Sequence, residues 1–259
     1  MGSSTPKPIR LAILEADTPV PGIKARYGSY GGVFTYLFKR ACDGLDPPQP
    51  LSSQLELSFH NIVDNLDAYP DPETIDAVLI SGSKASAFEN EEWIVRLAQY
   101  TRRVLEEARV RVIGVCFGHQ IIGRALGAKV ARCERGWELS VTEVELNEEG
   151  KEFFGMEKLR IHQMHRDAVL THPPGVKNLA RTDICDTQVF YKPKRLISVQ
   201  GHPEFTEDMV REILEKRRYG GIITDVLFKD GMRRVGDEHD GVAVAKLFLK
   251  FLREWEEDE

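Results

Sequence analysis

The sequence predicts an α/β protein with an open, mostly parallel sheet flanked by helices and extended by antiparallel strands. In the first half of the chain, short apolar runs of strand length alternate with longer segments of helical periodicity. In the second half, several strand-like runs follow one another without helices of comparable length between them. The 259 residues, 42% of them hydrophobic, can bury a full core without disulfides or metals.

The first half supplies the parallel part of this sheet. We expect strands at Ile9–Leu14, Leu55–Val63, Ala77–Ser81 and Arg111–Val115. Apolar residues recur at helical spacing between and after them, which predicts helices at Ser29–Cys42, Glu91–Ala108 and Phe117–Leu126. Strands that alternate with helices in this way favour a parallel sheet covered on both faces.

The second half supplies the extension. Leu139–Leu146 interleaves apolar and polar residues, as a half-buried strand does. Further strands are expected at Asn178–Arg181, Val189–Tyr191 and Arg195–Val199, as antiparallel additions, and helices near Glu207–Arg218 and Val242–Trp255. With no internal repeat and no linker, residues 9–259 are expected to form one domain after a disordered tail over residues 1–8.

Charge and cysteine content exclude several classes of function. A net charge of −6 argues against a nucleic-acid binder, whose affinity rests on clustered Lys and Arg. The longest apolar runs are strand-sized, so no membrane association is expected. Cys42, Cys116, Cys133 and Cys185 show neither C-x-x-C pairing nor metal-ligand spacing, which predicts free thiols and no metal. The N-terminus has no apolar signal segment, so the cytoplasm is the expected compartment.

The most informative stretch is a strand that runs directly into Gly114-x-Cys116-x-Gly118 and then into a helix. A nucleophile on a sharp strand-to-helix turn crowds the residues two before and two after it, which favours glycine at both. The turn lifts the thiol above the carboxyl ends of the strands, at a helix N-terminus that favours the thiolate. A buried structural cysteine fits this motif about as well.

A second motif supplies partners for that cysteine. The strand after Arg195 ends in Gly201-His202-Pro203-Glu204. A thiolate nucleophile needs an imidazole to carry protons, and the imidazole needs a carboxylate to orient it. In an extended segment residues i and i+2 project to the same side, and Pro203 favours that form at His202. A His-Pro pair by itself is better interpreted as a surface turn. Because it follows a cysteine on a sharp strand-to-helix turn (a nucleophile elbow), it predicts instead a Cys116–His202–Glu204 triad.

Together the motifs resemble the class I, triad-type glutamine amidotransferase family. The family's G-x-C-x-G-x-Q is matched by Gly114, Cys116, Gly118 and Gln120, and its G-H-P-E by Gly201, His202, Pro203 and Glu204. Ser81-Gly82-Ser83 lies where the family has a glycine-rich oxyanion turn, and Met164-His165-Arg166-Asp167 is similar to its S-H-x-D segment. The resemblance covers most of the chain and implies the family's flavodoxin-like fold.

The resemblance implies the reaction and the residues that perform it. Cys116 would attack a γ-glutamyl amide, and the backbone N–H groups of Ser83 and Phe117 would hold the oxyanion. Substrate-binding residues carried over from the family are Gly82, Gln120, Trp137 and Glu138. Two positions depart from the pattern, since Ser83 replaces a second glycine and Met164 replaces a serine.

Other possible sites have simpler interpretations. His162 and His165 are three residues apart, but no acidic or cysteine ligand accompanies them at a familiar spacing, so no metal is expected. His119 is expected to pack or cap, and Cys133 and Cys185 to be core thiols. The Gly28–Gly32 stretch lacks the Lys-Ser/Thr of a phosphate loop and predicts a turn before a helix.

Three functional hypotheses remain open at this point. The first is a stand-alone hydrolase of glutamine or of γ-glutamyl peptides and conjugates, without a cofactor, as in the γ-glutamyl peptidase-like branch of the family. The second is a glutaminase subunit that supplies ammonia to a separate synthase partner. The third is a non-catalytic binding or regulatory protein, against which the intact Cys116, His202 and Glu204 argue. The leaving amine is not defined by the sequence.

Overall fold

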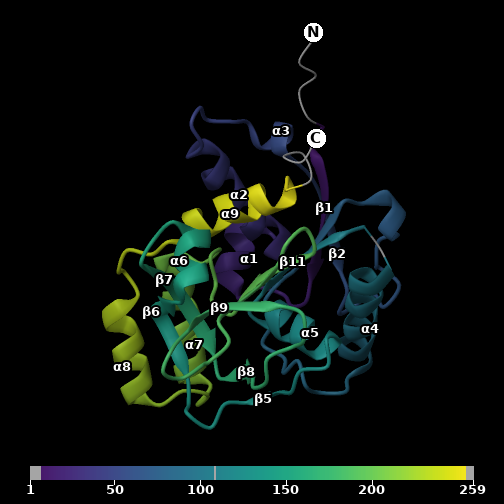
Figure 1. Cartoon of the computed structure of the whole chain (residues 1–259). Helices are drawn as coiled ribbons and strands as arrows, with labels where there is room; N and C mark the ends of the chain where they lie inside the picture. Colours follow the sequence, from purple (N-terminus) through teal and green to yellow (C-terminus); the bar gives the residue numbers. More distant parts are fainter. Residues whose placement is uncertain (1–6, 108, 255–259) are drawn as a thin grey trace.

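A mixed sheet forms the centre of the molecule, with helices against both faces (Figure 1). The computed structural model describes residues 7–107 and 109–254, and within them nine strands pair in the order β2-β1-β3-β4-β11-β10-β9-β6-β7. The strands are β1 (Ile9–Glu15), β2 (Leu55–Asn61), β3 (Ala77–Ile80), β4 (Arg111–Val115), β6 (Glu138–Leu146), β7 (Lys158–His165), β9 (Lys177–Arg181), β10 (Val189–Lys192) and β11 (Leu196–Val199).

The parallel half of the sheet places its carboxyl ends side by side. β2, β1, β3, β4 and β11 all run in the same direction. β3 and β4 are buried along their whole length, as expected for strands covered on both faces. In the register, Gly114 lies beside both Ile80 and Ser198, so the loops after three strands meet at one edge. Cys116 begins the turn at that edge.

The direction of one expected strand differs from the expectation. β11 was expected among the antiparallel additions, but it pairs parallel with β4, while β10, β9, β6 and β7 continue antiparallel. The reversal occurs between β10 and β11, which pair as antiparallel neighbours. As a result the Gly-His-Pro-Glu segment emerges at the same sheet edge as Cys116.

The two faces of the sheet have separate cores. On one face, α2 (Tyr30–Asp43) and α9 (Gly241–Leu252) pack against each other and bury Phe34, Phe38 and Phe248. On the other face, α4 (Glu92–Glu107) and α5 (Phe117–Ala125) pack against each other and bury Leu97, Phe117 and Ile121. Each such buried side chain contributes about 1.5–3 kcal/mol of apolar burial.

A third cluster covers the antiparallel end. α7 (Glu207–Tyr219) and α8 (Asp225–Arg234) pack together, and α8 contacts β6. Met209, Val210 and Leu214 of α7 lie in the same apolar cluster as Leu139 and Met164. Shorter elements complete the described chain: α1 (Pro21–Tyr27), α3 (Leu51–Gln54), a 3₁₀ turn (Pro72–Thr74), α6 (Glu148–Phe154) and a small sheet of β5 (Val130–Arg132) with β8 (Asp167–Val169).

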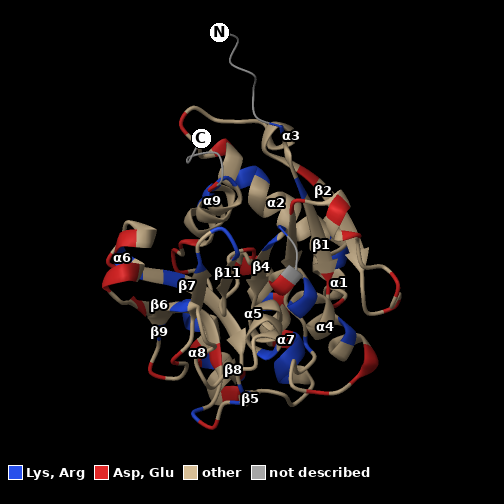
Figure 2. Cartoon of the chain, turned by 45° about the vertical axis from the view of Figure 1, so that its right-hand side comes forward, with Lys and Arg blue, Asp and Glu red and all other residues tan. Residues whose placement is uncertain are grey.

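Some expected boundaries fall outside the described residues. These are the first six residues of the expected tail, together with positions 108 and 255 at the expected helix ends. Among the described residues, no helix is long and apolar enough to cross a membrane. Acidic and basic residues are interspersed over the outer helices and loops (Figure 2).

Candidate active site

Cys116 occupies a strained turn between β4 and α5. Its backbone has φ 51° and ψ −101°, a left-handed conformation that is unusual for a residue other than glycine. A Cβ at position 118 would lie 2.2 Å from the carbonyl oxygen of Ile80, and one at position 114 would lie 2.8 Å from the backbone of Gly118. The two glycines therefore allow the turn to press against β3, and the thiol is presented to a cavity.

His202 follows β11 and is fixed from three sides. Its Nδ1 lies 2.8 Å from Oε1 of Glu204, in a pair that is almost fully buried. Its backbone N–H donates to the carbonyl of His162 at 2.7 Å, which ties the loop to β7. Its ring stacks on Phe205 with 4.0 Å between centroids. The imidazole therefore has little rotational freedom and leaves Nε2 for the thiol.

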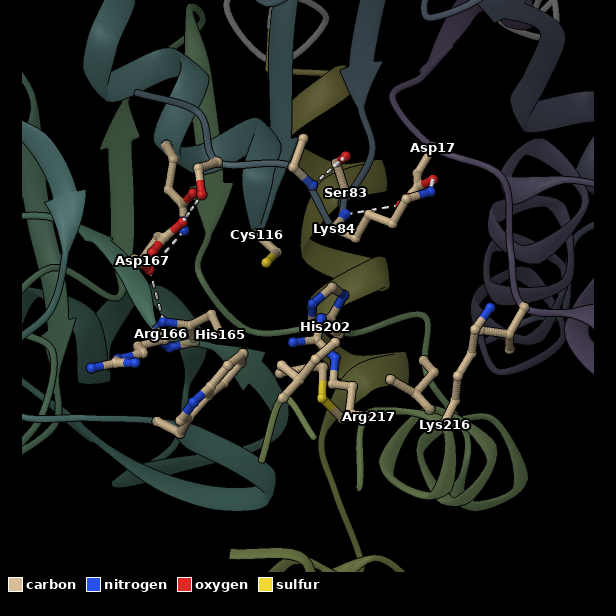
Figure 3. A pocket seen from close by; sticks show the side chains of 18 of the residues that line it. Asp17, Ser83, Lys84, Cys116, His165, Arg166, Asp167, His202, Lys216 and Arg217 are labelled. Atoms are coloured by element: carbon tan, nitrogen blue, oxygen red, sulfur yellow. Dashed lines mark hydrogen bonds and ion pairs between the residues drawn. The ribbon is translucent and has the colours of Figure 1, made fainter. Parts of the chain in front are cut away.

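The charges around His202 favour its protonated form. Burial lowers the pKa of this imidazole, but the negative charges of Cys116 and Glu204 and hydrogen bonds to both outweigh burial and raise it to about 10. Near neutral pH the imidazole is therefore a cation beside the sulfur. Figure 3 shows the Cys116 and His202 side chains directed into the same cavity. A thiolate–imidazolium pair is the state in which cysteine acts as a nucleophile.

The cavity has a volume of about 340 Å³ and charged walls on opposite sides of Cys116. Figure 3 shows Arg166 and Asp167 on one side, and Asp17, Lys84, Lys216 and Arg217 on the other. Two of the cations are paired: Lys84 Nζ lies 2.6 Å from Asp17, and Arg132 Nε lies 3.2 Å from Asp167. The other cations of the lining, Arg166, Lys216 and Arg217, give the cavity a positive charge that favours an anionic ligand.

The residues expected to form the oxyanion hole lie next to this pair. A Cβ at position 82 would lie 2.9 Å from Cε1 of His202, so only glycine fits there without displacing the imidazole. Ser83 lines the cavity, and Phe117 is the first residue of α5, where helix N–H groups lack internal partners. Among the described residues, neither of these two amides has a hydrogen-bond acceptor.

The expected substrate-binding residues separate into two groups. Gln120 and Trp137 line the cavity. The Gln120 amide donates to the carbonyl of Asp167 at 2.8 Å and to Gln200 at 3.1 Å, so those contacts hold its orientation. The buried Glu138 carboxylate instead accepts from Gln188 at 2.8 Å and lies 3.0 Å from Nε2 of His165. It reaches the cavity wall only through His165.

Sequence reasoning missed several polar residues of the cavity: Asp17, Tyr30, Arg166, Lys216 and Arg217. They come from four segments, namely the loop after β1, the start of α2, the link between β7 and β8, and the last turn of α7. Arg166 occupies only the unspecified position of the segment similar to S-H-x-D, and the other four belong to no catalytic motif. One signal was available for Asp17, because it follows the carboxyl end of a parallel strand, where open α/β sheets bind ligands.

The other buried histidines have structural surroundings. His119 has Nδ1 2.9 Å from the Ser198 hydroxyl and Nε2 3.1 Å from the Thr187 carbonyl, and burial lowers its pKa to about 3. Burial, assisted by His239 and His202, likewise lowers the pKa of His162 to about 3. Within the part of the chain that is described, no three His, Cys, Asp or Glu side chains form a group that could hold a metal.

Fold and site together define an α/β protein with an elbow cysteine and a His–Glu pair, the arrangement of a triad-type amidotransferase. The sequence profile of the glutamine amidotransferase class-I family matches residues 52–217. The chain therefore belongs to the class I glutamine amidotransferase family.

Relatives and solved structures agree with this assignment. A glutamine amidotransferase-like protein of Schizosaccharomyces pombe is 34% identical over 248 residues, covering 94% of this chain and 98% of the relative. Gamma-glutamyl peptidase 4 of Arabidopsis thaliana is 32% identical over 206 residues, 77% of each chain. The crystal structure of a glutamine amidotransferase from Thermotoga maritima superposes with a TM-score of 0.69 at 17% identity, covering 94% of this chain and 98% of that one, and shares the fold.

Proposed function

We propose that this chain is a cysteine-dependent hydrolase of γ-glutamyl amides, either glutamine or a γ-glutamyl peptide or conjugate. The observation that carries the proposal is the position of Cys116, in a strained elbow beside the buried His202–Glu204 pair and open to a charged cavity. A strained, buried nucleophile next to an oriented imidazolium has no structural purpose that a small apolar residue could not serve better.

In the first half of the reaction, the Cys116 thiolate attacks the γ-carbonyl carbon and a C–S bond forms. The carbonyl oxygen becomes an oxyanion, which the backbone N–H groups of Ser83 and Phe117 stabilise. His202 then gives its Nε2 proton to the amide nitrogen, the C–N bond breaks, and the amine leaves. A γ-glutamyl thioester on Cys116 and a neutral imidazole remain.

In the second half, water attacks the thioester carbonyl while neutral His202 accepts its proton. The C–S bond breaks, glutamate leaves, and the thiolate–imidazolium pair is restored. Glu204 stays ionised throughout and holds Nδ1–H of His202, which keeps Nε2 directed at the reacting atoms. Gly82, Gln120 and the main chain at Trp137 and Glu138 are proposed to bind the glutamyl end.

Two observations support a peptide or conjugate as substrate. The cavity of about 340 Å³ lies within the range of roughly 300–1,000 Å³ found for sites that bind drug-sized ligands. Such ligands are larger than glutamine, so the cavity has room for a longer γ-glutamyl compound. Relatives at 30–32% identity are named gamma-glutamyl peptidases.

Four cysteines buried as free thiols agree with a reducing compartment, which we propose to be the cytoplasm.

The test is to incubate the protein alone with L-glutamine and, separately, with glutathione, and to measure ammonia and glutamate. Glutamate from glutathione identifies a γ-glutamyl peptidase, and ammonia from glutamine identifies a self-sufficient glutaminase. Activity towards glutamine that arises only when a synthase partner is added would instead support the ammonia-supplying subunit.

Two cysteine variants complete the test. Cys116→Ala is expected to lower turnover by about 10⁴-fold or more, as loss of a catalytic nucleophile does. Cys133→Ala, which removes another buried thiol, is the matched control and should retain the wild-type rate. Full activity in Cys116→Ala would refute the mechanism.

A further inference from the structure

Arg217 is a half-buried cation that makes no ion pair within the described part of the chain. It lies in the last turn of α7 and lines the cavity. Among the described residues, its guanidinium makes no hydrogen bond and no ion pair, unlike the neighbouring Arg218, which donates to Asp225 at 2.7 Å. Burial lowers its pKa, although the acidic groups Cys116, Asp17 and Asp167 act in the opposite direction.

An unpaired guanidinium at a cavity wall contributes little to stability. A charge that is partly removed from water is normally paired or hydrogen-bonded, because its desolvation is otherwise uncompensated. The only favourable contact recorded for this guanidinium in the described chain is with an aromatic face: it lies 5.0 Å from the centre of the Trp137 ring. That interaction fixes its direction without neutralising it, so the cation is available to a ligand in the cavity.

The position of Arg217 relative to His202 indicates which part of a substrate it meets. In the proposed reaction, His202 protonates the departing nitrogen, so the leaving amine must lie on the His202 side of Cys116. Figure 3 shows Arg217 and His202 on the same side of the cavity, away from Arg166 and Asp167. A group attached to the leaving amine therefore extends towards Arg217.

We propose that Arg217, held in place by Trp137, binds a carboxylate on the leaving amine, so that the preferred substrates are γ-glutamyl amino acids or peptides with a free C-terminal carboxylate. This inference rests on the proposed function and narrows its substrate class. Glutamine releases ammonia and has no group that could make this contact. The planar guanidinium can bind a carboxylate through two parallel hydrogen bonds.

The decisive measurement compares γ-glutamylalanine with its C-terminal amide, which differ only in the charge of the leaving group. For the wild-type protein, kcat/KM is expected to be about 10- to 100-fold higher for the acid, the range of one charge-assisted hydrogen-bonded pair. In Arg217→Met that ratio should fall to about 1.

Control variants distinguish the effect of the Arg217 charge from a general effect of changing α7 and from the effect of the Trp137 ring. Arg218→Met removes the neighbouring charge of α7, and it should keep the wild-type ratio. Trp137→Leu should reduce the ratio through misplacement of Arg217, and Trp137→Phe should restore most of it. These ratios compare two substrates of one protein sample, so a lower yield of folded variant does not change them.

Each outcome has a distinct meaning. Equal cleavage of acid and amide by the wild-type protein would overturn the role of Arg217 and leave the hydrolase intact. A uniform loss in Arg217→Met for the acid, the amide and glutamine would place the cation at the glutamyl carboxylate instead, and overturn the proposal. Cleavage of none of these compounds by the wild-type protein would refute the proposed function itself.

Discussion

Two buried histidines, His119 of α5 in the core and His202 at the cavity, differ in charge. His119 lies three residues after Cys116 and is 0% exposed, whereas His202 follows β11 and is 4% exposed. The pKa of His119 is lowered to about 3, and that of His202 is raised to about 10. Burial is similar, so burial does not account for the difference.

The difference comes from what surrounds each ring. His119 contacts a hydroxyl and a carbonyl, which are neutral, so the desolvation cost keeps the ring uncharged. His202 faces Cys116 and Glu204, and its electrostatic interactions and hydrogen bonds with both exceed that cost. A histidine becomes reactive in this fold through its anionic partners, and one of those partners is visible in the sequence as His-x-Glu.

Glu204→Gln tests the reactive histidine and has the largest expected effect in this comparison. The amide keeps the shape of the side chain but removes the charge that favours the His202 imidazolium. Turnover of the preferred γ-glutamyl substrate is expected to fall by about 10²–10⁴-fold, as in other enzymes with a neutralised triad carboxylate. The fold should persist, and steady-state kinetics together with circular dichroism measure both properties.

The matched control removes a partner of the other histidine. Ser198→Ala deletes the hydroxyl that lies 2.9 Å from Nδ1 of His119. It should destabilise the protein by about 1 kcal/mol, the net value of one hydrogen bond, and leave kcat within a factor of two. A comparable loss of turnover in both variants would mean that the two histidines do not have separate roles.

His119→Leu has the next largest expected effect, and on stability only. The variant leaves the Ser198 hydroxyl and the Thr187 carbonyl without the ring, at an expected cost of about 2 kcal/mol at pH 7. Because the folded pKa of His119, about 3, is below the ordinary 6.5, its contribution is present above pH 6.5 and lost as pH falls towards 3. Wild type should therefore lose more stability than His119→Leu between pH 7 and pH 5.

Urea unfolding at the two pH values measures this difference. The kcat of His119→Leu at pH 7 should equal that of wild type. Equal acid sensitivity of both proteins would show that His119 does not contribute to the loss of stability in acid.

The same comparison explains what the sequence predicted well. The parallel strands and their helices have regular apolar patterns, so their positions were expected within a few residues. β7 was missed because apolar and polar residues alternate only over its first half, residues 158–161, whereas its second half buries the polar His162, Gln163 and His165. The predicted direction of β11 was wrong because the direction of a strand relative to the sheet depends on the strand it pairs with, which local sequence does not specify.

The site shows a similar division. Cys116, His202 and Glu204 lie in motifs whose spacing follows from backbone geometry, so the sequence located all three, and the structure brings them together. Arg217 and Asp17 reach the cavity from elements far apart in the chain, and their meeting depends on how α7 packs against α1 and against the apolar side chains of β6 and β7. That packing is tertiary, so no local pattern indicates it.

The pH dependence of turnover gives a smaller, graded effect. The leaving amine needs a proton from His202, whose raised pKa of about 10 keeps that proton available through neutral pH and is exceeded only in strong base. We expect kcat/KM to fall by about tenfold per pH unit above pH 10. In Glu204→Gln the decline should begin at lower pH, because Glu204 raises this pKa. A decline at the same pH in both proteins would assign it to another group.

Gly82→Ala is expected to have the smallest effect, and it tests how precisely the imidazole must be placed. The added Cβ would lie 2.9 Å from Cε1 of His202, so the ring must move by a few tenths of an ångström. Since the ring is also fixed by Glu204 and Phe205, we expect turnover to fall about three- to tenfold, against roughly 10²-fold for a full 1 Å misplacement.

Gly236→Ala is the control for this variant. The atoms nearest to a Cβ at position 236 would be those of the Glu207 carboxylate, at 3.1 Å, and this exposed side chain, paired with Arg211, can shift by a few tenths of an ångström. Its rate and stability should match those of wild type. If the turnover of Gly82→Ala also matched that of wild type, the rate would not depend on displacements of His202 by a few tenths of an ångström. The functional difference between His202 and His119 would then come from their charge alone.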